Sequence, residues 1–119
     1  MIKVFISSPY TGNEEENVKI QQNCANEIIN LGYNPFIPLL YHYQEKVHPQ
    51  PYNKWLEIDL DWVSSCDVLL RLPGKSPGAD REVEHAKKID LPVVYSIEEL
   101  VEWLEAANKD FESYGGVIV

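Results

Sequence analysis

Three carboxylates, those of Asp80, Glu82 and Glu84, occur in the stretch KSPGADREVEH at residues 75–85. At 3.6 residues per turn, Glu82 shares a helix face with the apolar Ala86, whereas Asp80 and Glu84 point elsewhere. Acidic side chains near a helix start favour the positive end of the helix dipole, so solvated positions explain Asp80 and Glu84. Glu82 must find a pocket, a partner or free backbone amides, and it is therefore the candidate chemical group.

A second acid interrupts an apolar helix face upstream. In the helix expected over about residues 51–64, Asp59 lies four residues after Trp55 and four before Val63. A buried aspartate can simply cap a neighbouring loop. Two inward carboxyls near one pocket also suit acid–base chemistry, because neighbouring carboxyls push their pKa values apart. Such pairs cleave glycosidic bonds, with one carboxyl as nucleophile and the other as proton donor or acceptor.

The turn before the second of these helices could hold an anion or a sugar. Ser76 offers a hydroxyl, Gly78 permits a close approach of the backbone, and a helix start expected near residue 79 offers free amides. Aromatic side chains in or near the neighbouring loops could stack on a base or simply pack. These are Tyr10, Tyr41, Tyr43, Tyr52 and Trp55.

Other polar residues give weaker indications. Arg71, Lys75 and Arg81 could supply positive charge for a phosphate, although solvated side chains are the simpler interpretation. His42 and His48 lack a third ligand at convincing spacing, so we expect no metal site and no cofactor.

Composition restricts the class of protein. A chain of 119 residues with 45% apolar residues predicts one folded domain over residues 1–119. A formal charge of −9 argues against a nucleic-acid polymer as partner, while a small nucleotide stays compatible with a helix N-terminus. No run approaches a membrane span, so we expect a cytoplasmic protein without a membrane partner. Cys24 and Cys66 form no C-x-x-C pair and are expected to pack as apolar groups.

Apolar runs and helical patterns alternate along the chain. Strands are expected at residues 3–7, 34–37, 66–72 and 91–95, and helices at about 13–31, 51–64, 79–90 and from 96 onward. Residues 39–50 show no period and predict a long loop, and the tail GGVIV could be a final strand. This alternation predicts a doubly wound α/β domain, Rossmann-like or flavodoxin-like, whose mostly parallel sheet of four to five strands has helices on both faces.

Topology then predicts the position of the site. In doubly wound sheets, ligands bind beyond the carboxyl ends of the strands, where the strand order reverses. For the common order 2-1-3-4-5, this point lies between the first and third strands. The loops that leave those strands are residues 7–12 and 73–78, so KSPGADREVEH is expected at the pocket.

Taken together, these features resemble the nucleoside 2-deoxyribosyltransferase family and its nucleotide N-glycosidase relatives. The family pattern Ser-x-Gly-x-x-x-Glu, with Ala four and Pro ten residues after the Glu, is matched by Ser76, Gly78, Glu82, Ala86 and Pro92. The upstream pattern Asp-Leu-x-Trp, followed by an Asp that opens the next strand, is matched by Asp59, Leu60, Trp62 and Asp67. The N-terminal strand and its small-residue loop are matched by VFISSPYTG.

The resemblance implies an enzyme that cleaves or transfers at the N-glycosidic bond of a nucleoside or nucleoside 5'-monophosphate. It implies a covalent glycosyl intermediate on Glu82, with Asp59 orienting the sugar or helping to protonate the departing base. Substrate-binding residues would be Ser8, Pro9, Tyr10, Ser76 and Gly78. The resemblance also implies a homo-oligomer in which residues 111–119 could complete a neighbour's pocket.

Two departures from the family pattern stand near the expected site. The first strand has Val4 and Phe5 where relatives often have tyrosine, and Glu84 stands where they often have glycine. The competing hypothesis is a non-catalytic nucleotide-binding module on the same fold, in which Glu82 and Asp59 bind a ligand or stabilise the structure.

Overall fold

The structure is a computed structural model that describes the backbone of residues 1–113 and the side chains as far as residue 107. The predicted strand in the tail GGVIV therefore lies outside the described residues. The homo-oligomer, and the part that the tail would play in it, stay predictions.

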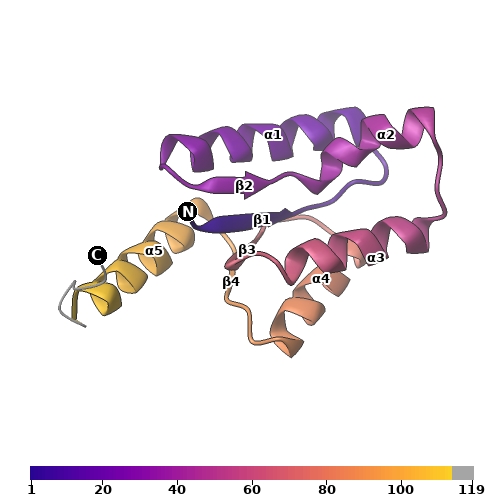
Figure 1. Ribbon diagram of the computed structural model, residues 1–119. Helices are drawn as coiled ribbons and strands as arrows, with labels where there is room; N and C mark the ends of the chain where they lie inside the picture. The colour runs from indigo at the N-terminus through magenta and orange to yellow at the C-terminus, as the bar shows by residue number, and fades with distance from the viewer. Residues whose placement is uncertain (114–119) are drawn as a thin grey trace.

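Four parallel strands form the central sheet in the order β2-β1-β3-β4 (Figure 1). The strands are β1 Lys3–Ser7, β2 Asn34–Phe36, β3 Val68–Arg71 and β4 Val93–Val94. Ser7 pairs with Arg71 at the carboxyl ends of β1 and β3. The strand order thus reverses between β1 and β3, which confirms the predicted α/β fold and places the switch point where the sequence predicted it.

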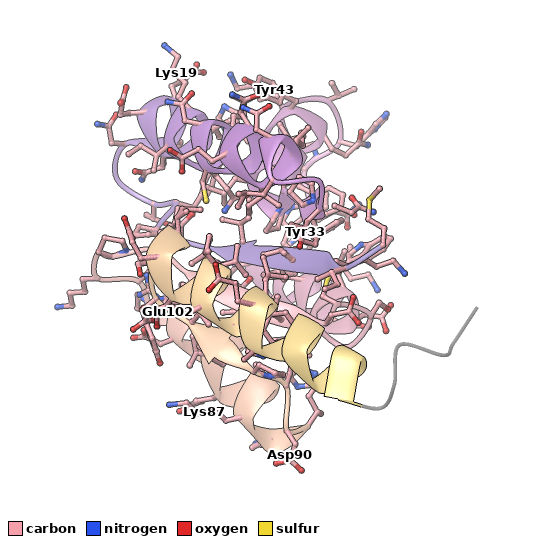
Figure 2. All side chains as sticks on the ribbon, turned by 90° about the vertical axis from the view of Figure 1, so that its left-hand side faces the viewer. Lys19, Tyr33, Tyr43, Lys87, Asp90 and Glu102 are labelled. Carbon is pink, nitrogen blue, oxygen red and sulfur yellow. The ribbon has the colours of Figure 1, made fainter. Side chains whose placement is uncertain are left out.

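Helices cover both faces of the sheet (Figure 1). On one face, α1 Glu14–Asn30 and α5 Ile97–Ser113 bury Ile28 and Leu100 against Ile6 and Leu70. On the other face, α3 Tyr52–Val63 and α4 Pro77–Lys88 bury apolar side chains against the opposite side of the same strands. Figure 2 shows Lys19 on the side of α1 that faces away from the sheet.

The segment predicted as a loop over residues 39–50 is mostly helical. It forms a 3-10 turn, Pro38–Leu40, followed by α2, Tyr41–Val47. A helix of only two turns is too short to show an apolar period, and tertiary burial of Pro38 and His42 decides its conformation instead.

Helix α4 begins earlier than the sequence predicted. Pro77 occupies its first turn, and the Ser76 hydroxyl caps it by accepting a 3.1 Å hydrogen bond from the Ala79 amide. Glu82 consequently lies in the second turn of α4 rather than in the first. The free amides of the helix start are therefore not its partners.

Both cysteines are buried and free, as the sequence predicted. Among the residues that the structure describes, no helix has the length and apolar character needed to cross a membrane.

Candidate active site

A cavity of about 700 Å³ opens beyond the carboxyl ends of β1 and β3. Its walls come from the loop after β1, α2, α3 and the first turns of α4. Six of the seven predicted site residues line it, namely Ser8, Tyr10, Asp59, Ser76, Gly78 and Glu82. Pro9 does not line it, because its ring packs behind the loop at Gly74.

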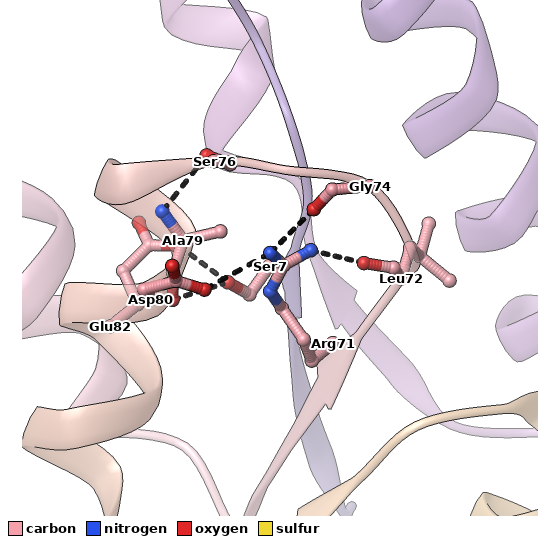
Figure 3. A network of polar contacts seen from close by, with 8 residues as sticks. All are labelled: Ser7, Arg71, Leu72, Gly74, Ser76, Ala79, Asp80 and Glu82. Carbon is pink, nitrogen blue, oxygen red and sulfur yellow. Dashed lines mark hydrogen bonds and ion pairs between the residues drawn. The ribbon is translucent and has the colours of Figure 1, made fainter.

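The Glu82 carboxylate is buried at the base of this cavity, with 6% of the residue exposed. Its Oε1 accepts a 2.7 Å hydrogen bond from the hydroxyl of Ser7, the last residue of β1 (Figure 3). Ser7 is fully buried and also lies 3.4 Å from the Ala79 carbonyl oxygen. A strand from the sheet therefore positions the side chain of a residue on α4.

The Asp59 carboxyl reaches the same place from α3. It is half-buried and interacts with the carboxyl of Glu82. Its Oδ1 is buried without a hydrogen-bond partner among the described residues. A buried polar atom of this kind costs free energy unless something pairs with it, and a proton shared with the neighbouring Glu82 carboxyl lowers that cost.

Burial raises the pKa of both acids. For Asp59, loss of solvent is the main cause and the negative charge of Glu82 the second, and together with their mutual hydrogen bond they raise the pKa to about 8. Loss of solvent also raises the pKa of Glu82, to about 7, while hydrogen bonds from Ser7 and Asp59 and the charge of Arg71 oppose that rise. The pair thus holds one shared proton near neutrality, mainly on Asp59, and leaves Glu82 as the acceptor.

Arg71 fixes the loop that carries the turn at Ser76. Although the sequence favoured a solvated side chain, only 8% of Arg71 is exposed. Its guanidinium donates to the carbonyl oxygens of Leu72 and Gly74, the latter at 2.7 Å, and forms a 3.2 Å ion pair with Asp80 (Figure 3). Arg71 therefore acts on the site in two ways, through the backbone behind the cavity wall and through the effect of its charge on Glu82.

Gly74 is required at this bend. Its φ of +121° disfavours side chains, and an added Cβ would lie 2.7 Å from the Pro9 ring. The Pro9 side chain therefore supports the bend of the loop. This contact explains why Pro9 follows the strand without reaching the cavity.

The two defined residues of the Ser-x-Gly turn, Ser76 and Gly78, each have a structural role at the mouth of the cavity. Ser76 caps α4, and Gly78 leaves room for the Tyr52 hydroxyl, which would lie 3.0 Å from an added Cβ. The Arg81 guanidinium lies 5.8 Å from the centre of the Tyr52 ring. Arg81 and Lys75 both line the cavity, which places two cations near this helix start.

Gln21 is a site residue that was not predicted from the sequence. Its amide nitrogen donates to the Ile6 carbonyl oxygen at 3.1 Å and to the Ser8 hydroxyl at 2.8 Å, and its oxygen accepts from the Leu39 amide at 2.9 Å. It is fully buried in α1 and lines the cavity. The helical phase could have shown it, because Gln21 lies three residues after Val18 on the buried face.

Ser7 was also missed. It ends a strand whose preceding three residues are all fully buried and apolar, and a buried hydroxyl there needs a partner. A serine hydroxyl at the end of the strand thus contacts the carboxylate of Glu82.

Aromatic residues line the remaining wall. Tyr41 and Trp55 face each other with ring centroids 5.1 Å apart, and both line the cavity together with Tyr10 and Tyr52. Tyr43 does not line it and is exposed. Within the described part of the chain, no group of three or more His, Cys, Asp or Glu side chains could hold a metal ion.

Comparisons with known proteins address the fold. Residues 2–96 match the model of a family described as Domain of unknown function (DUF7768). No curated protein matches the chain. One similar solved structure is described as a 2-desoxiribosyltransferase from Leishmania mexicana, with a TM-score of 0.62 and 13% identity. The alignment covers 80% of this chain and 63% of that one, less than two thirds of its length, and at this identity it shows a shared fold.

Proposed function

The chain belongs to the family described as Domain of unknown function (DUF7768), and we propose that it cleaves or transfers at the N-glycosidic bond of a nucleoside or nucleoside 5'-monophosphate. The observation that carries this proposal is the neighbouring pair of carboxyls, the buried Glu82 and the half-buried Asp59, that line one cavity. The shared fold with a solved deoxyribosyltransferase supports it.

Glu82 is the nucleophile in this proposal. Its carboxylate attacks the anomeric carbon of the sugar, the bond from that carbon to the base nitrogen breaks, and a glycosyl ester forms. The hydrogen bond from Ser7 to Oε1 opposes protonation of Glu82, because it stabilises the charged form. Ser7 thereby keeps the nucleophile ionised in a site whose burial would otherwise neutralise it.

Asp59 is the acid. The pKa of Asp59 is raised more than that of Glu82, so Asp59 holds the shared proton. The departing base nitrogen takes this proton as the glycosidic bond breaks. In the second step, water or a second base attacks the anomeric carbon, Asp59 accepts the proton of the attacking group, and the Glu82 carboxylate is released. Water as acceptor gives a hydrolase, and a second base gives a transferase.

The decisive experiment is a chromatographic screen of nucleosides and 5'-monophosphates for released base. The wild-type protein is compared with Glu82→Gln, which keeps the shape of the side chain and removes the nucleophile. Glu84→Gln is the matched control, since Glu84 is an exposed acid on the same helix. Release of base by the wild type and Glu84→Gln but not by Glu82→Gln supports the proposal.

Two results would count against it. Turnover that Glu82→Gln leaves undiminished excludes Glu82 as nucleophile. Thermal stabilisation by a nucleotide, with no base released from any compound, would instead favour a non-catalytic binding module on the same fold.

A further inference from the structure

One part of the cavity wall carries polar atoms that the proposed chemistry does not use. We call it the acceptor wall, and it consists of Tyr10, His42 and Glu45, all of which line the cavity. Tyr10 belongs to the loop after β1, and the other two belong to α2. The direction of each hydrogen bond within this wall determines what it presents to a ligand.

The tautomer of His42 determines whether the Tyr10 hydroxyl donates or accepts the hydrogen bond between them. Nε2 of this buried histidine lies 3.4 Å from Oε1 of Glu15, and a carboxylate only accepts hydrogen bonds, so Nε2 carries the hydrogen in the neutral ring. Nδ1 must then accept. It lies 2.6 Å from the Tyr10 hydroxyl, which therefore donates its only hydrogen to the ring. The lone pairs of the Tyr10 oxygen are left for the cavity.

Glu45 adds a second acceptor. Its Oε2 accepts hydrogen bonds from the Trp55 ring nitrogen at 2.6 Å and from the Gln50 amide at 2.8 Å. These two donors fix the orientation of the carboxylate on the wall. Its Oε1 accepts no hydrogen bond from the described residues, so it can accept from a ligand.

A flat ligand has a place to lie beside this wall. The rings of Tyr41 and Trp55 line the same cavity, with their centroids 5.1 Å apart. Aromatic faces of this kind stack on bases of any sequence, so they supply affinity without discrimination. Discrimination must then come from the edge of the base, where the acceptor wall is made of fixed acceptors.

We propose that the acceptor wall recognises the base by hydrogen bonds that the base donates, so the preferred substrate carries an exocyclic amino group, as adenine-type and cytosine-type bases do. This inference rests on the proposed function. A base that presents a carbonyl oxygen at the same position would face lone pairs on Tyr10 and Glu45 and leave them unpaired.

The test is calorimetric binding of free bases, which contain no glycosidic bond to cleave. Adenine is compared with hypoxanthine, and cytosine with uracil. At least one amino base should bind about tenfold more tightly than its oxo counterpart, the difference expected for one hydrogen bond to a charged acceptor. In Glu45→Gln, which introduces an amide donor, the preference should fall to less than about twofold or reverse.

Two further variants complete the design. Tyr10→Phe should reduce the preference by removing the second acceptor, and it serves as the test if Glu45→Gln fails to fold. Glu57→Gln, an exposed acid of α3 that does not line the cavity, should keep the wild-type preference. Equal binding of both members of each pair, a preference that both wall variants leave unchanged, or no binding of any base would overturn the inference.

The result is separable from that of the proposed function. Suppose that base release depends on Glu82 but kcat/KM is equal for amino and oxo nucleosides. This result would overturn base recognition by the acceptor wall and would still support the proposed chemistry. Suppose instead that amino bases bind more tightly, that this preference depends on Glu45, and that no nucleoside is turned over. This result would support base recognition by the acceptor wall and would overturn the proposed glycosidic chemistry.

Discussion

The hydroxyl of Ser7 donates a 2.7 Å hydrogen bond to Oε1 of Glu82, which joins the end of β1 to the second turn of α4. Residues 75 positions apart in the chain meet because parallel strands bring their carboxyl ends to one edge of the sheet. The bond counteracts the effect of burial on the pKa of Glu82. It therefore sets the charge of the group that we propose as nucleophile.

Replacing Ser7 by alanine should lower activity and shift its pH dependence. Without the hydroxyl, burial acts unopposed by that bond and the pKa of Glu82 rises further. The acidic limb of the kcat/KM profile should move to higher pH, and activity at pH 6 should fall by about tenfold or more, one pKa unit being tenfold in the ionised fraction. Ser65→Ala, at an exposed serine, is the control. An unchanged acidic limb would show that Ser7 has no part in ionising Glu82.

Replacing Asp59 by asparagine should remove the alkaline limb of the same profile. In the wild type, activity should decline as the pH rises through about 8, because the shared proton leaves Asp59. Asparagine has no proton to lose there and also none to give, so kcat should fall by about 10²–10⁴-fold. The loss should be smallest for nucleosides whose base leaves readily without protonation. A persistent alkaline limb in Asp59→Asn would assign that limb to another group.

The carboxyl pair should also make stability depend on pH. The folded chain binds the shared proton more tightly than the unfolded chain, so the contribution of this pair to stability is greatest below about pH 4 and is lost as the pH rises to about 8. Asp59→Asn removes this loss, and it should exceed the wild type by about 2 kcal/mol in free energy of unfolding at pH 8. The two proteins should converge as the pH falls toward 4.

Urea denaturation at pH 4, 6 and 8 measures this difference. Asp61→Asn, at an exposed acid of the same helix, should follow the wild type at each pH. If Asp59→Asn and the wild type differ equally at all three values, the Asp59 carboxyl does not hold a proton in the folded chain.

The periodicity of apolar residues in the sequence predicts both the sheet and the position of the site. Apolar runs such as Val68–Leu70 are buried on both faces, and their alternation with helical periods determines the topology of a doubly wound sheet. Helical phase places Glu82 and Asp59 on inward faces, and both line the cavity. Periodicity is enough here because each helix has twelve residues, about three turns.

Features that depend on tertiary contacts could not be predicted in the same way. The two-turn helix α2 has no readable period, yet it supplies His42 and Glu45 to the cavity. Arg71 looks solvated in the sequence, because nothing local shows that the carbonyl oxygens of Leu72 and Gly74 turn back toward it. Gln21 lies on the buried face of α1 with Val18, but tertiary structure alone brings its partners Ser8 and Leu39 to it.

Adding a methyl group at Gly78 should disturb the mouth of the cavity. The new Cβ would lie 3.0 Å from the Tyr52 hydroxyl, closer than ordinary van der Waals contact, so the tyrosine ring must move. Gly78→Ala should raise KM by a few-fold to tenfold with a smaller effect on kcat. The double variant Gly78→Ala with Tyr52→Phe removes the hydroxyl from this contact and should recover most of the loss. Failure of that rescue would place the effect of Gly78 elsewhere, as in direct contact with substrate.

Arg71 and Asp80 form one ion pair but should respond very differently to substitution. Asp80 is 69% exposed at its side chain, so Asp80→Asn should change the free energy of unfolding by less than about 1 kcal/mol. Arg71→Met should cost about 2–4 kcal/mol, because it leaves the carbonyl oxygens of Leu72 and Gly74 without their donor. It should also move the acidic limb of activity to higher pH, since the charge of Arg71 lowers the pKa of Glu82. Arg71→Met with normal stability and an unshifted limb would contradict both roles, and a shift shared by Asp80→Asn would assign the effect to the ion pair.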